Sequence, residues 1–294
     1  MNNEQLVTRH SSLVPMVTFS AFADEVSTDF LEQLRFLQSQ QIGYIELRFV
    51  NKKNSLDLTK DELAEVKMML NDYGIKVSAI ASPIGKVKID QPFAPHFDRY
   101  KHAVALAHYF DTSLIRVFSY YPPEGSDRPI EDFRTEVMER MAMKAAYLNG
   151  TGITMVHENE SHIYGHSAEN CADIMKTVNS PHLKLAYDPA NFVWGDNITD
   201  NVNRCFPIMQ PYVVHVHIKD WKIGSKDIGS MPGEGDGQID KLFKELADMK
   251  YNGFITMEPH LYSGGQFGGV TTPEQYVEAI AKTRTLCKKY CLIN

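Results

Sequence analysis

Four residues with metal-binding side chains stand where four short apolar segments of this sequence end. The segments ITMVHENE, LKLAYDP, VVHVHIKD and GFITMEPH supply Glu158, Asp188, His217 and Glu258. Along the sequence, each of these four residues follows the previous one after about the length of one strand plus one helix, and the last interval is slightly longer. Because parallel strands all place their carboxyl ends on one face of a sheet, we expect the four side chains to converge on one point.

The donor atoms of these residues indicate which metals they would hold. Three carboxylates and one imidazole supply mostly hard oxygen donors, which suit Mn²⁺ or Mg²⁺, with Co²⁺ or Zn²⁺ as alternatives. A structural zinc site would use cysteines, and none accompanies these residues. Any one member alone could be a helix-capping carboxylate or a hydrogen-bonded core histidine. The series of four favours a site for one divalent ion.

The composition sets the class of protein. The 294 residues, 43% of them hydrophobic, are enough for one barrel-sized domain or two smaller ones. A net charge of −7, with basic residues scattered among acidic ones, disfavours nucleic acid as a partner. The N-terminus lacks the plan of a signal peptide, and no apolar stretch approaches the roughly 18 residues that span a bilayer. With four dispersed cysteines and no CxxC pair, we predict a cytoplasmic protein with reduced thiols and no membrane contact.

Eight short runs rich in β-branched and aromatic residues predict eight strands. They cover residues 16–22, 43–48, 76–81, 114–119, 152–158, 183–188, 213–218 and 253–258. Amphipathic segments between them predict helices over residues 28–40, 59–73, 96–110, 131–148, 168–179, 239–249 and 273–290. Thr59 and Glu62 have the spacing of a capping box, and Thr272–Pro273 fits a cap followed by proline in the first turn.

The alternation of strands and helices predicts the fold. It favours a parallel sheet, and eight such units match a closed (β/α)8 TIM barrel in number and size. We therefore predict the α/β class, with a single barrel domain over residues 16–294 and an N-terminal extension over residues 1–15. An open doubly wound sheet is the alternative. It usually carries a glycine-rich turn after the first strand, and the turn here, FADEVSTD, contains no glycine.

Side-chain alternation along each strand selects which residues point into the barrel. The interior of such a barrel is packed and only its top layer opens to solvent, so the last inward residue of each strand is the functional candidate. The pairs expected to share an inward face are Glu158 with Glu160, His217 with Lys219 and, if the chain stays extended, Glu258 with His260.

Eight motifs of the chain resemble the sugar phosphate isomerase/epimerase family, the xylose isomerase-like TIM barrels that include the ketose 3-epimerases and the apurinic endonuclease. They are FADE, SPIGK, IRVF, HENESHIYG, YDPANF, HVHIKD, MPGEG and MEPH, and they run from near residue 16 to near residue 285. The resemblance implies that one divalent ion is held by Glu158, Asp188, His217 and Glu258, with the two glutamates as the acid/base pair. It also implies a small carbohydrate substrate, and it is compatible with a homo-oligomer, because family members often form dimers or tetramers.

The chemistry of such a site is proton transfer next to a carbonyl. A divalent ion on the carbonyl and hydroxyl oxygens stabilises an ene-diolate, while a carboxylate on each side of the carbon removes and returns a proton. We therefore predict an isomerase or epimerase of a small sugar, sugar phosphate or polyol-derived ketone. The alternatives are a lyase on the same site (a keto-inositol or dehydroshikimate type dehydratase), a phosphodiester nuclease and a non-catalytic sugar-binding barrel.

Two departures from the family pattern disfavour the nuclease. Three residues after the aspartate, where the 3-epimerases and the endonuclease carry a histidine, this chain has Asn191. The stretch KDIGSMPGEG lacks the histidine that would complete a multi-metal site. The segment MPGEGDG also resembles a phosphate-cradling turn, but Glu234 and Asp236 would repel a phosphate, so we interpret it as a βα loop.

Seven further residues are candidates for substrate contact. They are Lys219, Asn191, His260, Glu160, Arg48, Lys86 and Trp194. Lys219 would neutralise a developing oxyanion, Asn191 would hydrogen-bond a sugar hydroxyl, and Trp194 would form an apolar wall. His260 and Glu160 would orient the metal ligands. Arg48 and Lys86 would hold a hydroxyl or a phosphate. Each has a structural alternative, as an ion-pair partner or a plain loop residue.

Overall fold

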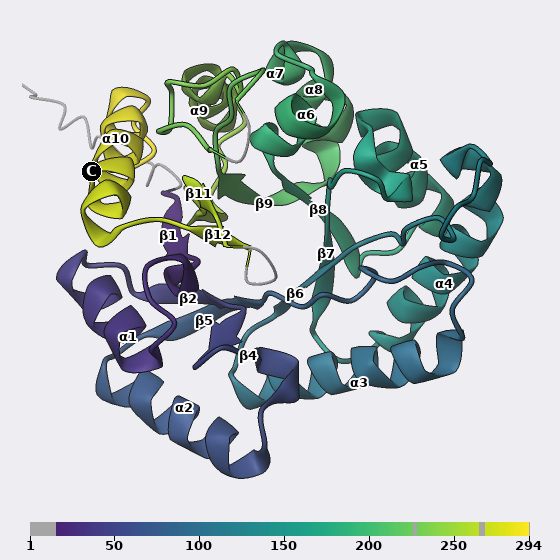
Figure 1. Ribbon diagram of the computed structural model, residues 1–294, viewed down its shortest axis with the longest axis horizontal. Coiled ribbons are helices and arrows are strands. Elements are labelled where there is room, and N and C mark those ends of the chain that lie inside the picture. The colour runs from purple at the N-terminus through teal and green to yellow at the C-terminus, as the bar shows by residue number, and fades with distance from the viewer. Residues whose placement is uncertain (1–15, 226–227, 265–267, 294) are drawn as a thin grey trace, which may run out of the picture.

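The computed structural model describes residues 16–225, 228–264 and 268–293, so the extension predicted over residues 1–15 lies outside the described residues. Eight parallel strands close into a barrel in the order β1-β10-β9-β8-β7-β6-β5-β2 (Figure 1). They are β1 (Thr18–Ala21), β2 (Tyr44–Leu47), β5 (Lys76–Ile80), β6 (Leu114–Val117), β7 (Thr154–Glu158), β8 (Leu183–Tyr187), β9 (Val213–Ile218) and β10 (Phe254–Met257). Each lies within a predicted strand, and the predicted TIM barrel is confirmed.

Helices surround the barrel and follow the predicted amphipathic segments (Figure 1). They are α1 (Phe30–Ser39), α2 (Lys60–Asp72), α3 (Phe93–Tyr109), α4 (Arg134–Tyr147), α5 (Ala168–Val178), α9 (Ile239–Asp248) and α10 (Pro273–Lys289). The capping box of Thr59 and Glu62 is confirmed, and Thr272 caps α10 with Pro273 in its first turn. In the described part of the chain, no helix combines the length and the apolar character needed to cross a membrane.

Between β8 and β9 the chain forms three short helices that the sequence pattern did not predict. They are α6 (Pro189–Asp196), α7 (Asn201–Arg204) and α8 (Phe206–Met209). Asp188 caps α6, because its Oδ1 accepts from the amides of Ala190 and Asn191 at 2.8 and 3.2 Å. Proline, glycine and asparagine interrupt the helical periodicity here, so no apolar stripe marks the segment. The cap fixes the Asp188 carboxylate at the carboxyl end of the barrel.

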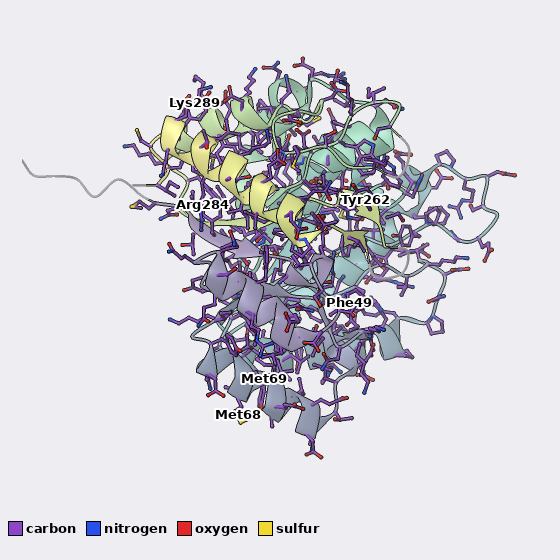
Figure 2. All side chains as sticks on the ribbon, turned by 60° about the vertical axis from the view of Figure 1, so that its left-hand side comes forward. Phe49, Met68, Met69, Tyr262, Arg284 and Lys289 are labelled. Carbon is purple, nitrogen blue, oxygen red and sulfur yellow. The ribbon has the colours of Figure 1, made fainter. Side chains whose placement is uncertain are left out.

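The last helix covers the seam where the first strand pairs with the last. Arg284 of α10 donates from Nη2 to the carbonyl of Gln40 after α1 at 2.5 Å, and Lys289 pairs with Asp240 of α9 at 2.6 Å. Figure 2 shows both basic side chains on α10. Helix α10 is therefore tied to the helices on either side of it, which closes the outer ring.

Alternation along β7 separates two buried neighbours in the sequence. Glu158 points into the barrel, whereas His157 faces α5, where its Nδ1 lies 4.0 Å from Sγ of Cys171. A Cβ at Gly165 would come within 2.3 Å of the His157 ring, so this close approach requires glycine. The four cysteines are free thiols, and three of them, Cys171, Cys205 and Cys287, are buried.

The glycine-rich segment MPGEGDG wraps around a carboxylate of its own chain. Asp220 is buried just after β9 and accepts hydrogen bonds from the amides of Gly233, Gly235 and Gly237, each at 2.9 Å. A Cβ at Gly235 would lie 2.4 Å from Asp220 Oδ1, so a larger residue does not fit. The turn that resembles a phosphate cradle is therefore filled by Asp220, and its backbone donors are used within the fold.

Replacing Asp220 by asparagine should destabilise the fold strongly. Its Nδ2 group would face amide donors, so at least one buried N–H would lose its acceptor and the charge-assisted bonds would be lost. We expect the free energy of unfolding to fall by about 2–4 kcal/mol, measured by urea denaturation. Asp236→Asn is the matched control. The side chain of Asp236, in the same loop, accepts one hydrogen bond, from the exposed amide of Ile223 at 2.9 Å. The control should lose less than about 1 kcal/mol, and equal losses would contradict the cradle.

Candidate functional site

The four predicted ligand residues meet at the carboxyl end of the barrel, and we call them the cage. Ligand atoms of Glu158, Asp188, His217 and Glu258 all lie within 4.8 Å of one another, and all four residues are buried. Glu158 ends β7 and His217 lies near the end of β9, whereas Asp188 and Glu258 directly follow β8 and β10. These four strands are neighbours in the barrel, which brings the side chains together.

The imidazole of His217 is held between carboxylates on both sides. Its Nε2 lies 3.3 Å from Glu46 Oε2, and its Nδ1 lies 3.3 Å from both Glu158 Oε1 and Glu258 Oε2. The same Glu46 oxygen lies 2.7 Å from Nε2 of His215. With Nε2 turned toward Glu46, the ring presents Nδ1 to the barrel mouth, and the carboxylate fixes the orientation of the ring.

Sequence reasoning missed Glu46, which lies in the middle of β2. It is fully buried, and the segment YIEL around it is otherwise apolar or aromatic. A buried carboxylate needs a partner, so an acidic residue inside a predicted core strand was the available signal. Its partners, His215 and His217, lie far away in the sequence, which is why the pattern alone did not reveal the contact.

Opposite charges in this cluster shift the pKa values of its members. Burial disfavours the charged ring of His217, but the carboxylates of Glu46 and Glu158 outweigh burial and raise the pKa of His217 well above its ordinary value. Burial also opposes ionisation of Glu258, but Lys219 and His217 hold its pKa well below the ordinary value. A charged imidazole between ionised carboxylates is therefore the stable state of these side chains at neutral pH.

Each of the two cage glutamates also pairs with a buried arginine. Arg116 Nη1 lies 3.2 Å from Glu158 Oε2, and Arg48 Nη1 lies 3.1 Å from Glu258 Oε1. Both guanidinium groups lie over the ring of Phe22, with Cζ 5.2 and 4.4 Å from its centroid. Arg48 was a predicted contact of the substrate. Arg116 was missed, although a single arginine inside the apolar run LIRVF was the available signal.

Lys219 and Asn191 connect the cage to helix α6. Lys219 Nζ lies 3.1 Å from Asp188 Oδ2 and donates to Asn191 Oδ1 at 2.7 Å. The amide of Asn191 in turn donates to the carbonyl of Asn159 at 2.8 Å and to Glu158 Oε1 at 3.3 Å. Burial raises the pKa of Asp188 above its ordinary value, although Lys219 lowers it. The two residues thus orient cage carboxylates as well as facing the mouth.

Two hollows adjoin the cage and share Glu160, Lys219 and His260. The outer hollow, of about 210 Å³, has further walls of Asn191, Trp194, Trp221 and Ser263. The inner hollow, of about 190 Å³, is lined among others by Arg48, Lys86, Arg116, Glu158 and Glu258. All seven residues predicted to contact a substrate therefore lie on the wall of one hollow or both, which leaves their binding role as a prediction.

Three of these residues have surroundings that the sequence did not define. Trp194 lies on α6 rather than in a loop and is 49% exposed. Lys86 pairs with Glu160 at 2.8 Å. His260 does not continue the strand, because β10 ends at Met257 and the backbone of His260 has a φ of +50°. The extended chain that strand alternation requires is therefore not present, yet His260 lines the inner hollow together with Glu258.

The donor atoms of the cage fit a divalent ion. Among the described residues, Glu158 Oε2, Glu258 Oε2 and both ring nitrogens of His217 are buried and take part in ion pairs, but they have no hydrogen bond of good geometry. Buried polar atoms normally have one, and carboxylate oxygens with one imidazole nitrogen are ligands for Mg²⁺, Mn²⁺, Co²⁺ or Zn²⁺. The cage can therefore bind a metal ion.

Two other groups of acidic and histidine side chains are close enough to hold an ion. They are Glu46–His215–His217 and Glu25–Glu258–His260. In the first, Glu46 already contacts both imidazoles at 2.7 and 3.3 Å. In the second, Arg48 lies 3.1 Å from one carboxylate and 3.7 Å from the other. The cage offers four ligand residues, whereas each of these groups offers three, so the cage remains the better candidate.

Comparison with protein families places this chain in a known group. The model of the family described as xylose isomerase-like TIM barrel matches residues 34–286. The chain belongs to this family. The resemblance predicted from its motifs is thereby confirmed. A search of curated proteins gave no match.

Solved structures share the xylose isomerase-like barrel at low sequence identity. D-psicose 3-epimerase with D-tagatose from Clostridium cellulolyticum H10 is 16% identical with a TM-score of 0.72, covering 92% of this chain and 99% of its own. The probable 3-DHS dehydratase AsbF, involved in petrobactin synthesis, from Bacillus anthracis is 17% identical with a TM-score of 0.70, covering 92% and 98%. A xylose isomerase-like TIM barrel protein from Mycobacterium smegmatis in complex with magnesium is 14% identical with a TM-score of 0.71, covering 94% and 97%. These similarities show the common fold.

Glu46→Gln should weaken metal binding by the cage without removing a ligand. A neutral amide supports the Nε2–H of His217 less strongly than a carboxylate, so Nδ1 becomes a poorer donor to the metal. We expect the affinity for Mn²⁺ to fall about 10–100-fold, measured by isothermal titration calorimetry. Glu124→Gln is the control, since it removes one negative charge at a side chain that is 86% exposed and pairs with Lys88 outside the cage. An equal loss in both variants would mean that only net charge matters.

Metal binding by the cage should release about one proton per ion near neutral pH. Burial lowers the pKa of His217, but the carboxylates around the ring outweigh burial and raise the pKa well above its ordinary value. Nδ1 must therefore lose its proton to become a ligand. Titration with Mn²⁺ in buffers of different ionisation enthalpy gives the number of protons. The affinity should also increase with pH up to the pKa of His217. A count of zero would show that the ring is neutral before the metal binds.

Proposed function

We propose that this protein is a divalent-metal-dependent isomerase or epimerase of a small sugar, sugar phosphate or polyol-derived ketone. The observation that supports it best is the pair of glutamates at the cage, each 3.3 Å from His217 Nδ1 and each matched with a buried arginine. Glu158 comes from β7 and Glu258 follows β10, with β8 and β9 between them. Two carboxyl groups separated in this way suit proton removal at one carbon by the ionised group and proton return by the other once it is protonated.

The side chains of the chain itself divide the reaction between them. A divalent ion held by the cage would supply charge stabilisation for the ene-diolate. Burial opposes ionisation of Glu158, but His217 and Arg116 hold its pKa below the ordinary value, so it can accept a proton from the carbon next to the carbonyl. Return of a proton to the neighbouring carbon, after exchange with solvent on the glutamate, gives isomerisation. Delivery to the opposite face by the other glutamate, once it has taken up a proton from solvent, gives epimerisation.

The walls of the two hollows suit a small polar substrate. Lys219 and Asn191 place an ammonium and an amide next to the cage, 2.7 Å apart, where they would meet substrate oxygens. Trp194 supplies an apolar surface at the outer hollow, which suits the face of a sugar ring. The name of one similar structure, D-psicose 3-epimerase with D-tagatose, supports a ketose-type substrate.

A lyase on the same site is the second candidate. It would begin with the same proton removal and then lose a hydroxyl group next to the ene-diolate. The similarity to the probable 3-DHS dehydratase of Bacillus anthracis supports the lyase as a candidate. A phosphodiester nuclease has less support, because Asn191 stands in place of the family histidine and donates its amide to Glu158 and Asn159.

Incubation of the Mn²⁺-loaded protein with ketoses, ketose phosphates and keto-inositols in D₂O tests the proposal. We expect one of them to give an isomeric product with deuterium next to the carbonyl, detected by NMR. Glu158→Gln and Glu258→Gln should each slow this reaction at least about 100-fold, because each removes a proton-transfer group. Glu124→Gln is the control, since its side chain is 86% exposed.

Other outcomes would redirect the proposal. Complete retention of protium in the product would favour a hydride shift over proton transfer. A product lighter by one water would identify the lyase. Ligand binding with no turnover of any compound, and with no loss in the two glutamine variants, would favour the non-catalytic barrel.

A further inference from the structure

Two cations lie on one aromatic ring beside the cage. Lys86 Nζ lies 4.4 Å and Arg116 Cζ 5.1 Å from the centroid of the Phe118 ring. Arg116 is only 6% exposed, and both residues line the inner hollow. We infer that Lys86 and Arg116 form an anion seat, and that the substrate carries a carboxylate or a phosphate held there. The inference rests on the proposed function for the identity of its ligand as the substrate.

The loop that carries Lys86 is fixed against the end of β6. The amide of Phe118 donates to the carbonyl of Ile84 at 2.7 Å, and the amide of Tyr120 donates to the carbonyl of Gly85 at 3.0 Å. Gly85 has a φ of +95°, and a Cβ there would lie 2.0 Å from the carbonyl oxygen of Phe118. Only glycine fits such a contact. The ammonium of Lys86 is therefore presented from a rigid turn, so binding an anion there costs little ordering of the loop.

The donors of Arg116 are not used up by the fold. Its Nη1 pairs with Glu158 at 3.2 Å, and its Nη2 reaches the carbonyl of Ala81 at 3.5 Å. Its Nε is buried and has no hydrogen-bond partner among the described residues. A guanidinium in a dry site normally uses its donors in paired bonds to a carboxylate or a phosphate. The incomplete bonding of Arg116 is what a substrate oxyanion would complete.

The charges on the walls of the inner hollow also favour an anion. Among the described residues, its cations are Arg48, Lys86, Arg116 and Lys219, and its carboxylates are Glu158, Glu160 and Glu258. A divalent ion in the cage would offset the charges of two of these carboxylates, Glu158 and Glu258. Lys219 keeps Asp188 as its partner at 3.1 Å, Arg48 keeps Asp24 at 2.7 Å and Lys86 keeps Glu160 at 2.8 Å. Arg116 pairs with Glu158 at 3.2 Å, so an ion that offsets Glu158 would leave the charge of Arg116 in excess. An excess of one sign in a confined mouth attracts a ligand of the other sign.

Binding of three matched compounds to the full-length, Mn²⁺-loaded protein tests the anion seat. The compounds are D-fructose, D-fructose 6-phosphate and D-fructuronate, which differ only in the group at the last carbon. Isothermal titration calorimetry should show at least one charged compound binding about ten-fold or more tightly than fructose, as expected for a charge-assisted contact. A preference for the phosphate or for the carboxylate identifies which group the seat takes. Equal or tighter binding of fructose overturns the inference, as does the absence of binding by all three.

A pair of lysine variants separates the seat from general electrostatics. Lys86 and Lys88 have side chains that are each 34% exposed, and each pairs with one glutamate. Of these two lysines, only Lys86 lines the inner hollow. Lys86→Gln should weaken binding of the charged compound about ten-fold and leave fructose binding within about two-fold. Lys88→Gln should leave both unchanged. Equal effects of the two variants, or an equal effect of Lys86→Gln on charged and neutral compounds, would overturn the inference.

The two proposals fail in different experiments. Loss of the deuterium exchange expected for the isomerase, with the charge preference intact, would reject the reaction and keep the anion seat. Deuterium exchange with a neutral ketose, without any charge preference in binding, would reject the seat and keep the reaction.

Discussion

The two nitrogen atoms of His217 face opposite ways, one toward Glu46 inside the barrel and the other toward Glu158 and Glu258 at its mouth. Rotation of the ring would break the contact with Glu46 and leave a buried carboxylate with one imidazole partner instead of two, which is costly. The ring therefore fixes where a cation can lie. It also requires that strands β2, β7 and β10 keep their places around it, because Glu46 lies on β2, Glu158 ends β7 and Glu258 directly follows β10.

Burying so many carboxylates in one place requires basic groups of the same chain. Arg48 and Arg116 offset the negative charges of the two cage glutamates, and Lys219 offsets that of Asp188. Both guanidinium groups also make cation–π contacts with the ring of Phe22. These ion pairs do not by themselves make the fold more stable than an apolar core would, because desolvation of the charges opposes the attraction. Their presence makes sense as a property of the site, where they hold the carboxylates ionised and oriented, as the proposed proton transfer would require.

The eight strands and the cage could be predicted because each strand is a short apolar run and each cage residue ends one. Glu46 and Arg116 could not, since each is a single polar residue inside a short strand whose partners come from distant strands. The helices between β8 and β9 lacked an apolar stripe, and Asp188 was recognised only as a strand-end residue and not as the cap of α6. The turn of the backbone at His260 depends on where β10 ends, and strand boundaries are the least certain part of any pattern.

The pairing of the cage with basic residues also bears on how the protein matures. Glu158, Asp188 and Glu258 each have a cation from the same chain within 3.2 Å, so closing the barrel needs no ion to offset their charge. This differs from small zinc domains, in which metal binding supplies the free energy of folding. The barrel can therefore be completed before any ion binds. The ion that the proposed cage would hold would then depend on which metal is available to the finished protein, because affinity alone separates similar divalent ions poorly.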